Sequence, residues 1–526
     1  MTPERLSRSH IWSLAVASVL AVGIIHWRTL FIGLQPDTLL CVRPWTMAEL
    51  QRSLAGTWLF PNVDLYHRPL ATLIFWAGFT AFGLNSWALH ATSLLMLVGT
   101  CWLLGGWLAR EAGITVALSV MAFYLTHPVL LDSTIAGPQY HFHLIPLVLV
   151  AGTVRLWVAR RSGRTLAAWW PILALPVVGF YAKEDTIMIV PVLLVLQALR
   201  ARLFGDVAWP SRAVLGASAI LAIILCAIRW SIFPHFETVG GFASRVGYEG
   251  LRIAVYAPAR TAFGMFFRGD ILLGTTALVL LLQVAGAVRA WRSPRSPAGW
   301  TWICGLVMLI AFCAPLTITA EIRSTRLHLA VFSAAIMLGA GGIALIDWAA
   351  SRWSWGRRVA ITMLVVAIGA QWNVQSLTRN QRFLSCSSEQ LIANSYAATW
   401  PEITPDLRRW LANMPSICTR DGSASPEASL DSMRWSNPES DVVLVHRTAA
   451  DVTLVFDAPP QDTAVTVVVD GDRRAHVIEA AASTITIPLT PTWRTWLRRD
   501  FRIDVRPTEI GGALPQLHDV RVRRHP

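Results

Sequence analysis

Long apolar segments separated by short polar turns recur from residue 11 to about residue 380. Apolar segments that can cross about 30 Å of hydrocarbon as helices are typical of polytopic membrane proteins. We therefore predict an all-α membrane domain with about eleven transmembrane helices. Their expected positions are residues 11–33, 88–108, 113–129, 141–159, 166–182, 185–199, 211–230, 271–290, 300–319, 325–348 and 359–377.

One further apolar segment, residues 69–84, is short, and the loop arginines decide where it lies. If it lies along the outer membrane surface, the arginine-rich turns fall on the cytoplasmic side, as the positive-inside rule requires. If it crossed the membrane, the cluster at 155–164 would be exposed outside. We therefore expect an interfacial helix, a cytoplasmic N-terminus with a retained first anchor, and an extracytoplasmic tail.

The pattern changes after residue 378, where polar residues become frequent and 421–440 is rich in proline, serine and aspartate. Beyond this stretch, apolar residues recur with a period of two, and turn signals such as Asp470-Gly471 separate the runs. This pattern predicts a small β-sandwich, which binds glycan or acts as a structural cap. The expected strands are 442–445, 452–456, 464–469, 484–487 and 501–505.

The expected organisation has three parts: a transmembrane domain at 1–379, whose first outer loop is 34–87, a connecting segment at 380–440, and the β-sandwich at 441–526.

Composition supports this class, because 54% of the 526 residues are hydrophobic and the mean hydropathy is +0.48. The net charge of +13 comes from arginines spread over short loops and the tail, so no nucleic-acid partner is expected. No cytoplasmic loop contains the nucleotide-binding pattern GxxxxGK[ST]. The arginine bias is typical of GC-rich bacterial coding, so we expect a bacterial inner (plasma) membrane.

The seven cysteines show no metal-like spacing. Cys386 and Cys418 lie in the predicted extracytoplasmic tail, where thiols can oxidise, and we expect a disulfide between them. Cys41 is on the same side and is the competing partner.

The 45 basic side chains are 44 arginines and one lysine, Lys183, in Tyr181-Ala-Lys-Glu-Asp185. A lysine ammonium is a compact point charge suited to a single phosphate oxygen. Ionisable residues near bilayer depth usually line polar cavities, although chance in an arginine-rich composition also explains a lone lysine.

Asp37 follows Pro36 at the end of the first span, where proline stops the helix and leaves the carboxylate at the outer surface. A carboxylate there can take a proton from a hydroxyl, and low dielectric raises its pKa towards that of a general base. A helix-end cap is the alternative role.

A second outer acid, Asp132, follows His127 in a loop that ends with Tyr140 and His141. These side chains suit sugar or phosphate contacts, or an interfacial belt. His141 and His143 are two residues apart and lie on different helix faces, so a shared metal is not expected.

Arg68 precedes the segment at 69–84, where its planar fork suits a phosphate or anchors a lipid headgroup. Arg323 lies in another outer turn, where it stabilises a departing phosphate or pairs with Glu321.

The order of these landmarks resembles the GT-C class of integral membrane glycosyltransferases, especially its protein O-mannosyltransferase-like branches, over about residues 10–200. In that class the catalytic carboxylate lies in the first outer loop. Here Pro36-Asp37 stands where the class usually has paired acids or a DxD-like sequence, which leaves a role for a divalent cation open. The landmarks are Asp37, Tyr66-His-Arg-Pro-Leu70, Phe82-Gly-Leu-Asn85, His127-Pro128 with Asp132, and Lys183-Glu184.

The resemblance implies a hexosyl- or pentosyltransferase that takes sugar from a polyprenyl-phosphate donor and passes it, with inversion, to a hydroxyl of an extracytoplasmic glycan, lipid or protein. It implies that Asp37 is the base, that Asp132 orients substrate hydroxyls, and that Arg68, Lys183 and Arg323 bind the lipid phosphate. The other substrate-binding candidates are Glu184, Tyr140, His141 and His127.

Three other functions stay open. A flippase or transporter of lipid-linked glycans needs polar or broken helices, for which only residues such as Arg28, Arg229 and Pro176 give weak hints. A non-catalytic scaffold would display the β-sandwich, but eleven spans are many for anchoring one small domain. A glycan ligase would transfer a chain from a lipid-linked oligosaccharide rather than one sugar.

Overall fold

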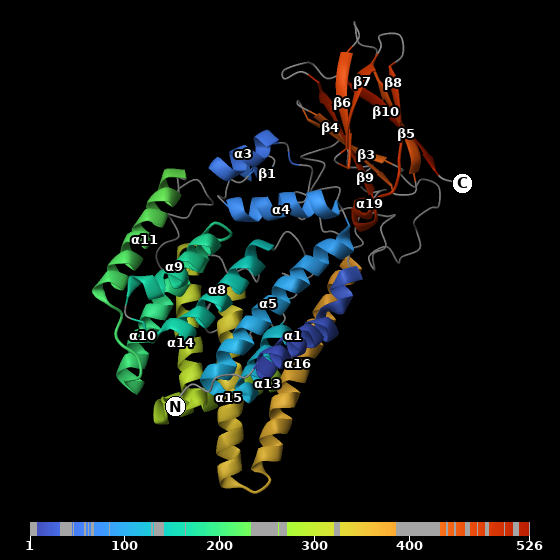
Figure 1. Cartoon of the computed structure of the whole chain (residues 1–526). Coiled ribbons are helices and arrows are strands. Elements are labelled where there is room, and N and C mark those ends of the chain that lie inside the picture. Colours follow the sequence, from blue (N-terminus) through green and yellow to red (C-terminus); the bar gives the residue numbers. More distant parts are fainter. Residues whose placement is uncertain are drawn as a thin grey trace. The chain divides into compact units, whose positions relative to one another are not determined.

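A computed structural model of the chain gives the arrangement of the helices and strands (Figure 1). The residues that the structure describes are 8–31, 45, 47–56, 59–60, 63–64, 68–83, 85–127, 130, 141–163, 165–232, 261, 271–319, 327–385, 432–437, 440–446, 449–457, 463–470, 472–478, 483–498, 500–508 and 515–524.

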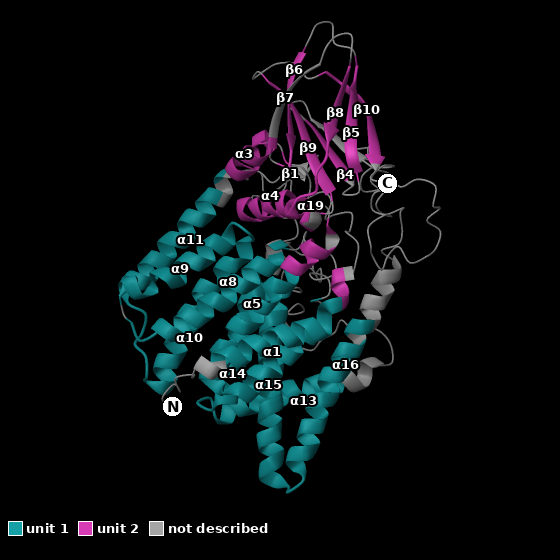
Figure 2. Ribbon diagram, turned by 45° about the vertical axis from the view of Figure 1, so that its right-hand side comes forward, with its two compact units in different colours: residues 1–27, 93–135, 140–381 teal, residues 28–92, 136–139, 382–526 magenta. Residues whose placement is uncertain are grey.

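The chain forms two compact units (Figure 2). The second unit contains residues from the predicted first outer loop together with the C-terminal strands, although several hundred positions separate them in sequence. The first unit is Met1–Trp27, Ser93–Ile135 and Tyr140–Gln381, and the second is Arg28–Thr92, Ala136–Gln139 and Arg382–Pro526.

The described residues of the first unit form helices and the short turns between them, which confirms a predominantly helical, multi-pass membrane domain. Six helices within the described part of the chain are long and apolar enough to cross a membrane. Four more are apolar but shorter, and one of these, Pro69–Phe82, belongs to the second unit, so the count of eleven stays a prediction. The helices are α1 (Arg8–His26), α5 (Ser86–Ala112), α6 (Ile114–Thr126), α8 (His141–Arg160), α9 (Leu166–Phe180), η3 (Glu184–Met188), α10 (Ile189–Phe204), α11 (Arg212–Ile232), α13 (Ile271–Arg292), α14 (Pro297–Thr319), α15 (His328–Arg352) and α16 (Gly356–Ser385).

Helix α15 is the most buried of the candidate spans and packs against α6, α13 and α14. Small residues make this close packing feasible, as is usual between membrane helices. A Cβ atom on Gly339 would lie 2.7 Å from the backbone nitrogen of Val120, and one on Gly341 would overlap the carbonyl of Leu282. Alanine at either position would force α15 away from its neighbours.

A buried ionic network joins the ends of α5, α8 and α10. The carboxylate of Glu111 lies 2.5 Å from Arg161 Nη1 through one oxygen and 2.5 Å from Arg200 Nη1 through the other. Arg200 also binds Asp206 at 2.6 Å, and all of these side chains except Asp206 are almost fully buried. In our topology this network lies at the cytoplasmic end of the helices.

We expect Glu111→Gln to lower the free energy of unfolding by about 3–5 kcal/mol, because it removes the carboxylate that the buried guanidinium groups of Arg161 and Arg200 share and leaves Arg200 with Asp206 alone. The measurement is the unfolding midpoint of purified protein in detergent. The matched control is Asp347→Asn, whose exposed pair with Arg289 spans 3.9 Å and should contribute less than about 1 kcal/mol. Equal shifts in the two variants would show that the Glu111 network does not stabilise the fold.

In the second unit, the predicted segment 69–84 forms α4 (Pro69–Phe82), preceded by α3 (Met47–Ala55) and the short strands β1 (Leu59–Phe60) and β2 (Val63–Asp64). Fourteen residues make a helix about 21 Å long, which is shorter than the hydrocarbon core. Pro69 starts α4 because proline suits the first helical position, and Gly83 ends it with a φ of +55°. Ser53 Oγ and Thr72 Oγ1, 2.8 Å apart, join α3 to α4.

The C-terminal residues form two antiparallel sheets around one core, and each of the five predicted runs is a strand. One sheet has the order β3-β4-β9-β6-β7 and the other β10-β5-β8. Inward residues of both sheets, such as Val443, Leu454 and Ile503, are fully buried in the shared core. The elements are β3 (Ser432–Asn437), β4 (Ser440–His446), β5 (Ala449–Phe456), β6 (Thr463–Val469), β7 (Asp472–Ile478), β8 (Thr484–Pro488), α19 (Trp493–Arg498), β9 (Asp500–Pro507) and β10 (Leu517–Arg524).

Gly83 lies against the β region, since a Cβ atom on it would be 2.5 Å from Asp500 Oδ2. We expect Gly83→Ala to lower the unfolding free energy by about 1–3 kcal/mol, because positive φ and steric overlap both oppose a side chain. The control is Gly205→Ala, whose φ is +69° but whose Cβ meets nothing within 4 Å. A smaller loss at Gly83 than at Gly205, measured as unfolding midpoints, would contradict the close approach.

Candidate functional site

Of the nine predicted site residues, five are described by the structure: Arg68, His127, His141, Lys183 and Glu184. The other four lie outside the described residues, as does the predicted disulfide between Cys386 and Cys418. These four are Asp37, Asp132, Tyr140 and Arg323.

Lys183 is buried in the turn between α9 and η3. Its Nζ lies 2.6 Å from Asp185 Oδ2, and both side chains are largely buried. Two hydrogen bonds hold the turn, because Lys183 N donates to Gly179 O at 2.8 Å and Lys183 O accepts from Thr186 Oγ1 at 2.8 Å. The ammonium group therefore has a fixed position.

The buried His328 lies near this ion pair, and the buried His127 and His143 lie near His328. We call the five residues Lys183, Asp185, His127, His143 and His328 the buried polar cluster. The imidazole rings of His143 and His328 have their centroids 4.5 Å apart. Lys183 and His127 both lie close to His328. The cluster thus combines side chains from α8, α15 and η3 with those of His127, just after α6, and Lys183, just before η3.

The His127 backbone is held by another helix. Gln375 of α16 donates through Nε2 to the carbonyls of Leu125 at 2.9 Å and His127 at 3.2 Å. His26 of α1 lies 3.1 Å from the Leu125 carbonyl through Nε2. These bonds fix the end of α6 and the backbone of His127, which follows it.

His141 has a different partner from His143. Its Nε2 lies 3.0 Å from Ser93 Oγ of α5, so the two histidines on α8 belong to different contacts. Within the described ranges, no three His, Cys, Asp or Glu side chains are grouped so that they could hold a metal ion.

Glu184 is half-buried at the start of η3, and the ammonium of Lys183 pairs with Asp185. A lysine ammonium has three donors, and Asp185 takes one of them. The remaining two can bind phosphate oxygens. The buried polar cluster is therefore chemically suited to a phosphorylated ligand.

Arg68 is also buried, in the second unit, at the residue before α4. Its carbonyl accepts from Thr72 N at 3.1 Å and from Thr72 Oγ1 at 3.4 Å, which fixes its backbone. That Arg68 and Lys183 bind the same phosphate stays a prediction.

Sequence reasoning missed three residues of this region: Asp185, His328 and Gln375. His328 and Gln375 had a signal, because each is polar within an otherwise apolar predicted span, where such residues are usually functional or buried in the bundle. Asp185 had none that separated it from Glu184, because only the shape of the turn decides which acid faces the ammonium.

No protein-family model matches the chain, and no curated protein matches it. Among solved structures, the oligosaccharyltransferase of Archaeoglobus fulgidus tethered to an acceptor peptide aligns with a TM-score of 0.43 and 14% identity, covering 82% of this chain and 61% of that one. The archaeal oligosaccharyltransferase AglB from Archaeoglobus fulgidus, in complex with an inhibitory peptide and a dolichol-phosphate, aligns with a TM-score of 0.43 and 13% identity, over 80% and 61%. The chain thus spans less than two thirds of the length of these structures. Similarity at this level assigns this chain neither a substrate nor a mechanism.

Proposed function

We propose that this chain is a membrane glycosyltransferase that moves a sugar from a polyprenyl-phosphate donor to a hydroxyl group of an extracytoplasmic glycan, lipid or protein. The observation that carries the proposal is the buried polar cluster. The single lysine of the chain lies there, buried and held by Asp185, between apolar helices.

A buried ammonium in a membrane domain suits a phosphate leaving group for an energetic reason. Ionisable groups at membrane depth are costly and persist mainly where they serve a substrate or ion path. In a water-poor site, a fixed cation stabilises charge that develops in the transition state more strongly than it would in water. Lys183 would therefore lower the barrier to breaking the bond between the sugar and the phosphate.

The proposed reaction is a single displacement. Asp37 takes the proton of the acceptor hydroxyl, whose oxygen attacks the anomeric carbon of the donor sugar. The bond from that carbon to the phosphate oxygen breaks, and the electron pair leaves with the polyprenyl phosphate, which Lys183 binds. One displacement inverts the anomeric centre, and Asp132 orients the hydroxyls.

The order of the outer-loop landmarks supports the same proposal, because Asp37, Arg68, His127 and Lys183 follow one another as in the GT-C pattern. We place these residues on the extracytoplasmic side of a bacterial plasma membrane, in a domain of about eleven spans. The predicted cytoplasmic loops contain no nucleotide-binding pattern GxxxxGK[ST]. This agrees with a donor whose bond between sugar and phosphate is already activated.

Purified protein supplied with synthetic polyprenyl-phosphate monosaccharides tests the proposal. We expect transfer of radiolabelled sugar to an acceptor, or hydrolysis of the donor to polyprenyl phosphate and free sugar. Transfer from lipid-linked oligosaccharides alone would indicate a glycan ligase rather than a monosaccharide transferase. Intact donor that moves across liposome bilayers without turnover would favour a flippase and contradict the enzyme.

A further inference from the structure

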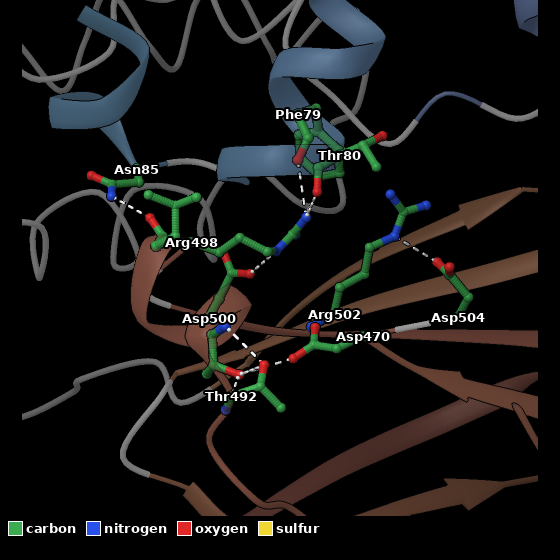
Figure 3. Close-up of polar contacts among 11 residues, drawn as sticks. Phe79, Thr80, Asn85, Asp470, Thr492, Arg498, Asp500, Arg502 and Asp504 are labelled. Atoms are coloured by element: carbon green, nitrogen blue, oxygen red, sulfur yellow. Dashed lines mark hydrogen bonds and ion pairs between the residues drawn. The ribbon is translucent and has the colours of Figure 1, made fainter. Parts of the chain in front are cut away.

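The C-terminal end of α4 is bound by an arginine of the β region (Figure 3). Arg498, the last residue of α19, donates through Nη1 to the carbonyl of Phe79 at 3.0 Å and to that of Thr80 at 2.7 Å. The last carbonyls of a helix have no partner within the helix, and a cation there also complements the helix dipole. Arg498 thus caps α4 from a position more than 400 residues away in sequence.

The guanidinium of Arg498 is itself held by a buried carboxylate. Its Nε donates to Asp500 Oδ1 at 2.9 Å, and both side chains are at most 3% exposed. Burial raises the pKa of the Asp500 carboxyl, and the charge of Arg498 opposes that rise. Removing Arg498 would leave an unpaired buried acid, which is far more disruptive than loss of a surface pair.

Two more contacts join the same elements. Asn85 Nδ2, just after α4, donates to Leu497 O at 2.6 Å. The guanidinium groups of Arg498 and Arg502 each lie 5.5 Å from the centroid of the Phe79 ring, within cation–π range. The end of α4 is therefore fixed in direction as well as in position.

Helix α19 is in turn fixed to the larger sheet. Asp470, in the turn after β6, accepts from Arg502 N at 2.9 Å through Oδ1 (Figure 3). Asp470 Oδ2 accepts from Thr495 Oγ1 at 2.9 Å. Its carbonyl accepts from Arg494 Nη1 at 3.0 Å. A continuous chain of hydrogen bonds thus runs from the sheet through α19 to α4.

We propose that Arg498 is a positioning residue through which the β region sets the direction of α4 and so places Arg68 at its start. This inference rests on the proposed function and on the role that the GT-C resemblance implies for Arg68, which is to bind the donor phosphate. Arg68 is tied to the same helix, because its carbonyl accepts from Thr72. The β region is then a brace for the donor site.

Amide hydrogen exchange of the full-length protein tests the brace without any activity. Arg498→Ala should raise exchange across α4 by at least about tenfold, since a hydrogen bond to a charged group contributes roughly that factor or more. The matched control is Arg521→Ala, whose Nε lies 3.0 Å from a carboxylate two residues away, as in Arg498, but on the surface. If Arg498→Ala does not fold, Asn85→Ala removes a single bond and should raise exchange in the same segment. Unchanged exchange in α4 would overturn the brace.

A double-mutant cycle tests whether the brace acts through Arg68. Arg498→Ala should raise the KM for the donor more than it lowers kcat, and Arg68→Ala with Arg498→Ala should be no worse than Arg68→Ala alone. Additive losses would mean that Arg498 stabilises the fold without positioning Arg68, and would overturn the proposal. Arg498→Lys should restore part of the donor affinity, because it keeps the charge but not the planar fork. If wild-type protein turns over no donor, the proposed function fails. The exchange experiment would still show whether Arg498 holds α4 in place.

Discussion

Replacing Asp37 with asparagine should lower the rate of sugar transfer by about 10²–10⁴-fold. Asparagine keeps the size of the side chain but cannot take the proton from the acceptor hydroxyl. The KM for the donor should change little, because in the proposal Asp37 meets the acceptor. Initial rates of purified protein at saturating donor and acceptor measure this loss.

The control for Asp37 is Asp472→Asn, which changes an exposed acid at the start of β7 and should leave the rate unaltered. The rate of wild-type protein should also fall as the pH drops through the pKa of the base, and the residual rate of Asp37→Asn should lack this dependence. A wild-type rate in Asp37→Asn would contradict its role, and Asp132 would become the first candidate base to test.

Lys183→Ala should lower kcat/KM for the donor by about 10²–10³-fold, because the leaving phosphate loses its fixed cation. Lys183→Arg should not restore the wild-type value. The turn holds a compact ammonium 2.6 Å from Asp185, and a planar guanidinium has a different shape and hydrogen-bond geometry. Steady-state kinetics with the donor varied measure both variants.

Arg202→Ala serves as the control for Lys183, because it removes an exposed cation near the end of α10. Asp185→Asn keeps the ammonium of Lys183 but loosens its position. The decrease in kcat/KM for the donor should therefore be smaller in Asp185→Asn than in Lys183→Ala. Donor kinetics of Lys183→Ala that match those of Arg202→Ala, in protein that elutes as a folded species, would remove Lys183 from the site.

Local patterns predicted the elements of this fold because each depends on residues close in sequence. Pro69 starts α4 and Gly83 ends it. The period of two after residue 441 predicted five strands that the structure contains. The apolar windows likewise predicted the helices, since burial of a helix in a membrane domain requires a long apolar segment.

The contacts between elements far apart in sequence could not be predicted from local patterns. Arg498 and Asp500 look like surface residues in sequence, and only the packing of α19 against α4 buries them. The sequence around Glu111 did not predict its ion pairs with Arg161 and Arg200, because those residues lie at the ends of two other helices. Such pairs depend on the tertiary arrangement, which a single sequence does not encode in any local pattern.

Release of polyprenyl phosphate from a synthetic polyprenyl-phosphate monosaccharide, followed by mass spectrometry with purified protein, tests the central claim most directly. We expect release by wild-type protein, loss of release in Asp37→Asn, and a decrease of about 10²-fold or more in Lys183→Ala. Donor recovered intact from folded wild-type protein with every sugar supplied, or release that is equal in all three proteins, would contradict the account.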